Sequence, residues 1–276
     1  MSKHYTILGI DGSGKTALVH RLMATTKLVQ HKTTFINAPN YHEASDSPFK
    51  NLSEKLEIFS SLSDELKSFE LKGVSLYLQA TLFGVIEQFF INNWQPEIIL
   101  SQRHPVLDSL VYGELYRQHM KGIDTSALHD QLLSKLQTRQ VPWDFILRWF
   151  ELHKQRTKSQ SSIWNFSQEI LGLFKLDWMD LIAELQFRYQ TQMPDGIIYI
   201  CPKVKTVLNK IDTRAQESQT NKELHENLAG LRELEKNYQR MLKFIKFNFP
   251  HIQIFEITAY DDTQTDKIIQ SLGNHL

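Results

Sequence analysis

Short apolar runs alternate with longer stretches of helical spacing along most of this chain. Runs rich in β-branched and aromatic residues predict strands from Tyr5 onward and at residues 33–37, 97–101, 196–201 and 252–257. Apolar residues at every third or fourth position predict helices at residues 17–22, 51–71, 74–94, 106–117, 223–247 and 263–272. Strands that alternate with helices predict an α/β fold, with a parallel sheet covered by helices on both faces.

Residues 120–193 interrupt this alternation, because they are helical in pattern almost throughout and rich in large aromatic residues. An apolar stripe at helical spacing runs through residues 169–189, which is typical of a helix packed against a core. Polar residues 154–162 predict a loop whose basic side chains face solvent. Gly73 is expected to end the helix that begins at residue 51. We therefore expect one domain over residues 1–276, with a helical insertion at residues 120–193.

The composition is ordinary for a globular protein, with 41% hydrophobic and 22% charged residues and a formal net charge of zero. A neutral chain offers no overall field that favours nucleic acid or an anionic membrane. Cys201 is the single cysteine, which excludes an intramolecular disulfide, and its apolar neighbours predict a buried, unreactive thiol. No run approaches the roughly 18 consecutive apolar residues of a membrane span, and no signal-peptide pattern opens the chain. We expect a cytoplasmic protein.

The first strand runs into a glycine-rich segment that fits the pattern G-x-x-x-x-G-K-[ST] at every fixed position. Without Cβ atoms, backbone N–H groups can fold around phosphate oxygens, and the following helix directs its positive end at the same anion. In this pattern Lys15 reaches the β- and γ-phosphates of a nucleoside triphosphate, and Thr16 places its hydroxyl on Mg²⁺. The predicted nucleotide site comprises Gly9, Asp11, Gly12, Ser13, Gly14, Lys15, Thr16 and Ala17. The alternative is a strand–turn–helix corner whose glycines only permit the turn.

Together with later segments, this motif resembles the thymidylate kinase and deoxynucleoside kinase group of P-loop phosphotransferases. Asp11 matches an acidic loop residue of the thymidylate kinases that contacts the acceptor sugar. Arg103-His104, with Asp108 downstream, resembles the family's Asp-Arg-Tyr/His segment after the third strand. Residues 194–199 resemble the strand before the family's lid, and residues 208–214 resemble the lid entry L-x-R-I-x-x-R, with Lys210 at the first arginine and Arg214 at the second. The resemblance covers residues 1–118 and 194–276.

The resemblance implies a P-loop-type fold and transfer of the γ-phosphoryl group of Mg²⁺·ATP to a nucleoside or nucleoside monophosphate. It implies catalytic roles for Lys15, Arg103 and Arg214, and a homodimer as a candidate assembly. The implied acceptor site comprises Asp11, Gln79, Arg103 and Asp108, and the implied metal site Thr16 and Gln102. Simpler interpretations are an ion pair between Arg103 and Asp108 one turn on, and loop capping by Asp11. For Arg214 the simpler interpretation is a solvated cation at a helix end.

Several positions depart from the family pattern. Gln102 replaces the family's aspartate, so it can hydrogen-bond to the metal's shell but adds no charge. Residues 37–39 lack the arginine or glutamate found there in the family, and Leu82 occupies a position that often holds a phosphate-binding arginine. A phosphorylated acceptor needs such cations, and an unphosphorylated one needs a base, for which Asp11, Glu43 or Asp108 could substitute. A catalytically degenerate nucleotide-binding module therefore stays open.

A different class is also open, because Asn209-Lys210-Ile211-Asp212 contains N-K-x-D, the guanine-reading motif of GTP-binding switch proteins. Residues 255–259 resemble the Ser-Ala loop of the same class. Against this interpretation, the switch motif D-x-x-G is absent after the third strand. The kinase interpretation instead predicts that residues 209–212 lie on a helix. ATP is thus the expected nucleotide and GTP the alternative.

Overall fold

The computed structural model describes residues 2–25, 32–201, 204–218, 226–257 and 266–268, apart from the side chains of residues 214–218. The chain divides into two compact units. The first comprises residues 1–37, 88–111 and 193–276, and the second comprises residues 38–87 and 112–192. The predicted insertion, except residue 193, therefore lies in one compact unit with residues 38–87 and 112–119.

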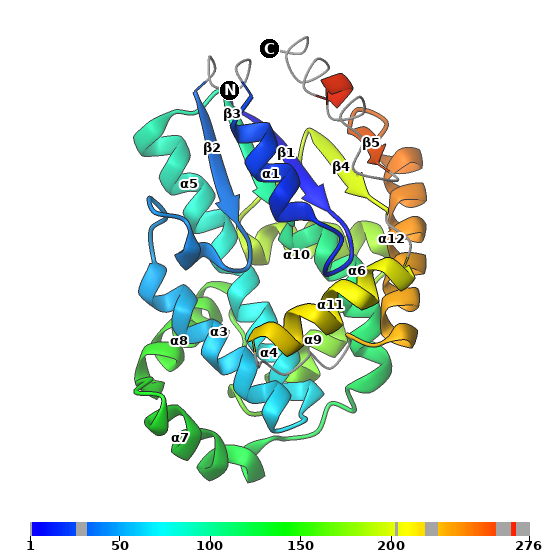
Figure 1. The fold of residues 1–276 in the computed structure, drawn as a ribbon. Helices are drawn as coiled ribbons and strands as arrows, with labels where there is room; N and C mark the ends of the chain where they lie inside the picture. Colours follow the sequence, from blue (N-terminus) through cyan, green and yellow to red (C-terminus); the bar gives the residue numbers. More distant parts are fainter. Residues whose placement is uncertain (1, 26–31, 202–203, 219–225, 258–265, 269–276) are drawn as a thin grey trace. The chain divides into compact units, whose positions relative to one another are not determined.

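The first unit contains a five-stranded, all-parallel sheet with the order β2-β3-β1-β4-β5 (Figure 1). The strands are β1 (Lys3–Leu8), β2 (Thr33–Asn37), β3 (Ile98–Gln102), β4 (Gly196–Ile200) and β5 (Gln253–Ile257). Each lies within two residues of an expected strand. The α/β fold with a parallel sheet is confirmed, because short β-branched runs buried on both faces form parallel strands.

Both faces of this sheet are covered by helices. Tyr5 and Ile7 of β1 lie in one apolar cluster with Leu18 and Leu22 of helix α1 (Lys15–Met23), which lies in front of the sheet in Figure 1. On the opposite face, Tyr199 of β4 packs against Tyr238 of helix α12 (Leu228–Asn248), with ring centroids 5.3 Å apart. Alternation along each strand sends successive side chains to the two faces.

The strand order changes direction at β1. Strands β2 and β3 lie on one side of β1, and strands β4 and β5 lie on the other. In open parallel sheets, ligands bind beyond the carboxyl ends of the strands at such a reversal. The glycine-rich segment follows β1 directly, so the fold puts it at this position.

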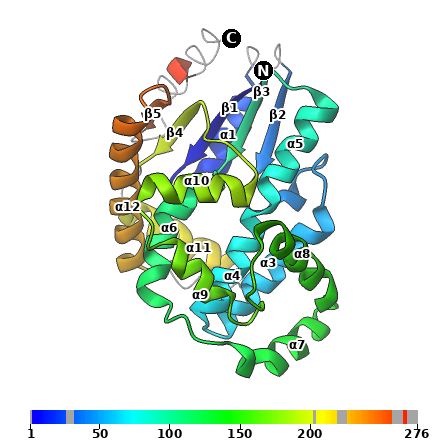
Figure 2. The same ribbon diagram turned by 180° about the vertical axis from the view of Figure 1, so that it is seen from behind.

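The second unit is helical. Its helices are η1 (Tyr41–Glu43), α3 (Lys50–Glu65), α4 (Phe69–Ala80), η2 (Ser126–Leu128), α7 (His129–Thr138), α8 (Trp143–Thr157), α9 (Phe166–Leu173) and α10 (Trp178–Tyr189). Figure 2 gives the clearer view of α9 and α10. Helices α5 (Leu82–Trp94) and α6 (Pro105–His119) run from one unit into the other, and α11 (Val204–Ser218) belongs to the first. The helical character predicted for residues 120–193 is confirmed.

The prediction that Gly73 ends a helix is wrong. The break comes earlier, where Ser68 begins α4 and its side chain accepts a hydrogen bond from the backbone N–H of Leu71 at 3.2 Å. Gly73 lies inside α4, and a Cβ atom there would come within 2.9 Å of the sulfur of Met120. The glycine therefore makes room for a neighbouring side chain instead of ending the helix.

The stripe at residues 169–189 forms two helices and not one. Asp177 separates them, because its carboxylate accepts hydrogen bonds from the N–H groups of Met179 and Asp180 and so begins α10. Residues 154–157, expected in a loop, belong to the last turn of α8. The closing helix expected at residues 263–272 falls largely outside the described residues.

Residues 69–94 are long and apolar enough to cross a membrane by length and composition, with a mean hydropathy of 1.4 over the most apolar window. However, 67% of that window is buried within the protein. A mostly buried core helix passes the same test, so this stretch by itself is weak support for a membrane span.

Two helical glycines offer a matched test of packing in the second unit. A Cβ atom at Gly84 would lie 2.2 Å from the carbonyl oxygen of Tyr189, whereas nothing lies within 4 Å of one at Gly172. We expect Gly84→Ala to lower the free energy of unfolding by about 1–3 kcal/mol, because backbone must move. Gly172→Ala should leave it unchanged or raise it by up to about 1 kcal/mol. Urea unfolding of both variants measures this, and equal effects would contradict the packing described.

Candidate functional site

The glycine loop (residues 9–16) leaves the end of β1 in a conformation that requires glycine. The φ angles of Gly9, Gly12 and Gly14 are 153°, 74° and 96°, in the region that side chains rarely adopt. A Cβ atom at Gly9 would lie 2.7 Å from both the carbonyl oxygen of Ile200 and the hydroxyl oxygen of Ser13. The glycines predicted from the motif are therefore needed for the backbone path, whatever the loop binds.

The loop ends at the amino terminus of α1, where Gly14 is the residue before the first turn. In the described part of the chain no side chain caps this terminus. Thr16 and Ala17 are exposed there, while Ser13 is buried and its hydroxyl has no hydrogen-bond partner among the described residues. Uncapped N–H groups and the helix dipole make such a terminus attractive to anions.

Lys15 folds back into the loop instead of extending into solvent, and the residue is only 5% exposed. Its Nζ donates to the carbonyl oxygens of Gly9 and Ile10 at 2.9 and 3.0 Å. One carboxylate oxygen of Asp11 lies 3.8 Å from the same ammonium group. A buried cation needs such acceptors, and here two of them are neutral carbonyls.

Arg103 joins this group from the segment after β3. Its φ of 68° is left-handed, and its backbone N–H donates to the carbonyl oxygen of Ile7 at 3.0 Å. One amino group of its guanidinium pairs with Asp11, and the other donates to Asp108 at 3.1 Å. The ion pair expected between Arg103 and Asp108 is thus present, and the structure adds Asp11. Two cations, Lys15 and Arg103, are balanced by two carboxylates.

The residues predicted to hold a metal contact each other. The hydroxyl of Thr16 donates to the carboxamide oxygen of Gln102 at 3.0 Å. The pair offers neutral oxygen atoms only, and no group of three or more His, Cys, Asp or Glu side chains suited to a metal occurs among the described residues. Mg²⁺ prefers oxygen ligands and often takes several from substrate phosphates and water. The pair fits Mg²⁺ when phosphate oxygens supply the charge.

Other predicted residues lie elsewhere or beyond the described side chains. Gln79 lies in α4 of the second unit, is 2% exposed, and has no hydrogen-bond partner for its carboxamide oxygen among the described residues. Its backbone carbonyl accepts a hydrogen bond from Tyr41 at 3.2 Å. The backbone of Arg214 belongs to α11, but its side chain lies outside the described residues.

The guanine-type motif lies within α11 and does not follow a strand directly. Asn209 and Lys210 are exposed, whereas Ile211 is buried. A Cβ atom at Gly12 would lie 3.2 Å from side-chain carbons of Val207 and Ile211, so α11 packs closely on the glycine loop. The prediction that residues 209–212 lie on a helix is confirmed. Residues 258 and 259 of the Ser-Ala-like segment fall outside the described residues.

Tyr238 is a member of this cluster that the sequence did not reveal as a site residue. It is fully buried, donates from its hydroxyl to Asp108 at 3.0 Å, and lies 3.4 Å from the carbonyl oxygen of Gly9. The partners are separated from it by 130 and 229 residues in sequence, so no local pattern could connect them.

Cys201 is half-buried and not fully buried as expected. Burial raises the pKa of its thiol, and the nearby carboxylates of Glu235 and Glu256 act in the same direction, although a hydrogen bond with Tyr199 opposes them. The thiol therefore stays protonated at neutral pH.

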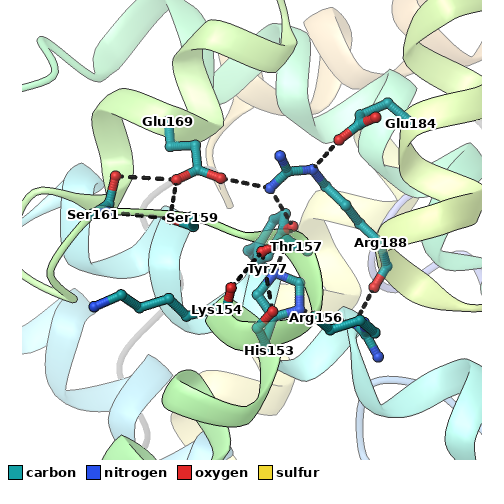
Figure 3. Close-up of polar contacts among 10 residues, drawn as sticks. All are labelled: Tyr77, His153, Lys154, Arg156, Thr157, Ser159, Ser161, Glu169, Glu184 and Arg188. Atoms are coloured by element: carbon teal, nitrogen blue, oxygen red, sulfur yellow. Dashed lines mark hydrogen bonds and ion pairs between the residues drawn. The ribbon is translucent and has the colours of Figure 1, made fainter.

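A second polar cluster lies in the helical unit (Figure 3). Arg188 donates to Glu169 at 2.7 Å, to Glu184 at 2.6 Å and to the hydroxyl of Tyr77 at 3.2 Å. His153 shares a hydrogen bond of 3.0 Å with the same hydroxyl and accepts one from Arg156 at 2.9 Å. Because Arg156 can only donate, Nε2 of His153 carries the ring proton. Arg156 was expected to face solvent and instead also bonds the carbonyl oxygen of Arg188.

The protonation states of this cluster are fixed at neutral pH. Burial, together with Arg156 and Arg188, lowers the pKa of His153 to about 3, and burial raises the pKa of Tyr77 far above its usual value. Burial alone would raise the pKa of Glu169, but hydrogen bonds from Ser159, Arg188 and Ser161 lower it. A general acid or base works best with a pKa near the working pH, so this cluster is a structural feature of the core.

The shifted histidine predicts a pH dependence of stability. Between pH 6.5 and about 3, His153 is protonated in the unfolded chain but stays neutral in the folded protein. The free energy of unfolding therefore decreases as the pH falls through this window. His153→Gln should make this decrease shallower, because glutamine can accept from Arg156 and donate to Tyr77 without titrating. Urea unfolding from pH 7 to pH 4 measures the slope. The same exchange at His129, whose side chain is 42% exposed, is the control, and equal slopes in both variants would contradict the assignment.

Neither family models nor curated proteins give a match to this chain.

Proposed function

We propose that this chain binds Mg²⁺·ATP in the glycine loop and transfers the γ-phosphoryl group to a small acceptor, a nucleoside or nucleoside monophosphate. In this proposal the parallel sheet is of the P-loop type, and the chain is a divergent relative of the thymidylate and deoxynucleoside kinases it resembles. The observation that carries it is Lys15, whose buried ammonium group is held by neutral carbonyls at the mouth of the loop.

An incoming triphosphate offers this ammonium group a stronger hydrogen-bond acceptor than the carbonyl oxygens of Gly9 and Ile10. Phosphate oxygens are charged, and charge-assisted hydrogen bonds are about twice as strong as neutral ones. The amino terminus of α1, which no described side chain caps, favours an anion, and the buried hydroxyl of Ser13 one residue before Gly14 has a hydrogen bond to give. Thr16 and Gln102 would hold Mg²⁺ through neutral oxygens, and the bound ion would neutralise charge on the phosphates.

The acceptor side of the proposal rests on Asp11 and Arg103. Phosphoryl transfer depends on positioning and on stabilising charge on the transferred group, so Arg103 is suited to the transferred phosphoryl. Asp11 places a carboxylate oxygen 3.8 Å from the ammonium group of Lys15 and is the proposed contact for the acceptor hydroxyl. Arg214 stays a candidate for a donor contact, and the role of Gln79 stays a prediction from the family resemblance.

ATP is favoured over GTP by the position of the N-K-x-D sequence. Asn209 and Lys210 lie on the exposed face of a helix whose opposite face packs on Gly12. In the switch class the aspartate of this motif reads guanine, and here Asp212 is half-buried in the middle of that helix. This arrangement supports the kinase-like proposal over a GTP-binding switch. It does not separate the kinase from a catalytically degenerate nucleotide-binding module, which would bind ATP in the same way without phosphoryl transfer.

Lys15→Ala tests the nucleotide site. Removing the ammonium group should weaken binding of Mg²⁺·ATP by about 3 kcal/mol, or roughly a hundredfold, because a buried charge-assisted contact is lost. Calorimetric titration with ATP and GTP measures this. Lys236→Ala removes an equal charge from a side chain that is 76% exposed in the same unit, and it should bind as the native protein does. Native affinity in Lys15→Ala would refute the loop as the site, and a strong preference for GTP would favour the switch class.

Gln102→Asp tests the metal site and turnover. A carboxylate beside Thr16 adds charge to the shell of Mg²⁺, so phosphoryl transfer should rise and half-saturation should require roughly tenfold less Mg²⁺. Gln102→Asn is the matched control, since it shortens the side chain equally and stays neutral. Transfer from labelled ATP to nucleosides and monophosphates provides the assay. Equal behaviour of the two variants would mean that the metal lies elsewhere, and no transfer by any variant would favour the binding module.

A further inference from the structure

Tyr238 connects the last long helix to the glycine loop. Its side chain is fully buried in α12, and its hydroxyl donates to one oxygen of Asp108 at 3.0 Å. The carbonyl oxygen of Gly9, which also accepts from Lys15, lies 3.4 Å from the same hydroxyl. A buried tyrosine hydroxyl normally finds a partner, and the two polar contacts just described both belong to the candidate site.

The carboxylate of Asp108 is held at both oxygens. Tyr238 contacts Oδ1, and Arg103 contacts Oδ2 at 3.1 Å. The remaining amino group of Arg103 pairs with Asp11, which lies 3.8 Å from Lys15. A continuous row of polar contacts therefore runs from α12 through Asp108 and Arg103 to the loop.

We propose that Tyr238 is a positioning residue that holds Arg103, through Asp108, in place for the γ-phosphate of the bound nucleotide. The inference rests on the proposed function. Arginine has many rotamers, and a side chain that must act on a phosphoryl group gains from being held beforehand. Asp108 holds one amino group of Arg103 in position. The other amino group can then exchange Asp11 for a phosphate oxygen while the side chain keeps its conformation.

Tyr199 provides a matched control for the hydroxyl. It is buried beside Tyr238 at a centroid distance of 5.3 Å, and its hydroxyl faces Cys201 instead of the loop. Removing either hydroxyl changes neither the charge nor the aromatic packing. A general loss of packing should therefore affect both variants alike, and a loss of positioning should affect Tyr238 alone.

The test is calorimetric titration of the full chain with Mg²⁺·ATP and Mg²⁺·ADP. Tyr238→Phe should weaken ATP binding about fivefold and leave ADP binding unchanged, because ADP has no γ-phosphate for Arg103 to meet. Tyr199→Phe should bind both as the native protein does. In an Arg103→Gln background the effect of Tyr238→Phe should disappear, since residues that act through one another are not additive.

Asp108→Asn supplies a second variant should Tyr238→Phe not fold. A neutral carboxamide can still contact both partners, but it holds the guanidinium of Arg103 without a charge-assisted bond, so Arg103 is less firmly placed and ATP binding should weaken although a negative charge is removed. Equal ATP affinity of Tyr238→Phe and Tyr199→Phe, a loss that persists in Arg103→Gln, or tighter ATP binding by Asp108→Asn would each overturn the positioning role. Failure of the native protein to bind ATP would overturn the proposed function as well, so the two failures are distinguishable.

Discussion

The buried ammonium group of Lys15 is the constraint on which the rest of the candidate site depends. A cation that is only 5% exposed must find acceptors, and the loop supplies them as the carbonyl oxygens of Gly9 and Ile10. Those carbonyls point inward because the glycines allow positive φ angles. Asp11 adds a negative charge nearby, which Arg103 balances, and Arg103 is balanced in turn by Asp108. One buried charge thus accounts for the arrangement of three others.

The sheet explains why these residues meet. Strand β1 lies in the centre of the order β2-β3-β1-β4-β5, so its carboxyl end is flanked by the ends of β3 and β4. Gln102 and Arg103 come from the end of β3, and α11 follows β4 and packs on Gly12. Parallel strands bring their carboxyl ends to one edge, and residues far apart in sequence are collected there without any local signal.

What could be predicted from the sequence was local. Each strand is a short apolar run, and the glycine loop is a pattern of eight consecutive residues, so neither needed knowledge of the fold. Gly73 misled the prediction because its role is to admit Met120, a contact with a residue 47 positions later. The ion pair between Arg188 and Glu169 was not predicted for the same reason, because tertiary packing and not sequence spacing determines which groups a buried charge contacts.

The two charged clusters of this protein show what separates a binding site from a structural network. In the helical unit, Arg188 is held by two carboxylates and a tyrosine, and His153 is kept neutral by its surroundings, so a phosphate oxygen would mainly replace bonds that are already charge-assisted. At the glycine loop, two of the acceptors of Lys15 are neutral carbonyl oxygens, and the carboxylate of Asp11 lies farther away at 3.8 Å. Exchanging a neutral acceptor for a phosphate oxygen is a gain, because the charge-assisted bond is the stronger one. Both clusters are charged, but at Lys15 a phosphate oxygen could replace neutral acceptors at a gain. For this reason the glycine loop is the better candidate for a binding site.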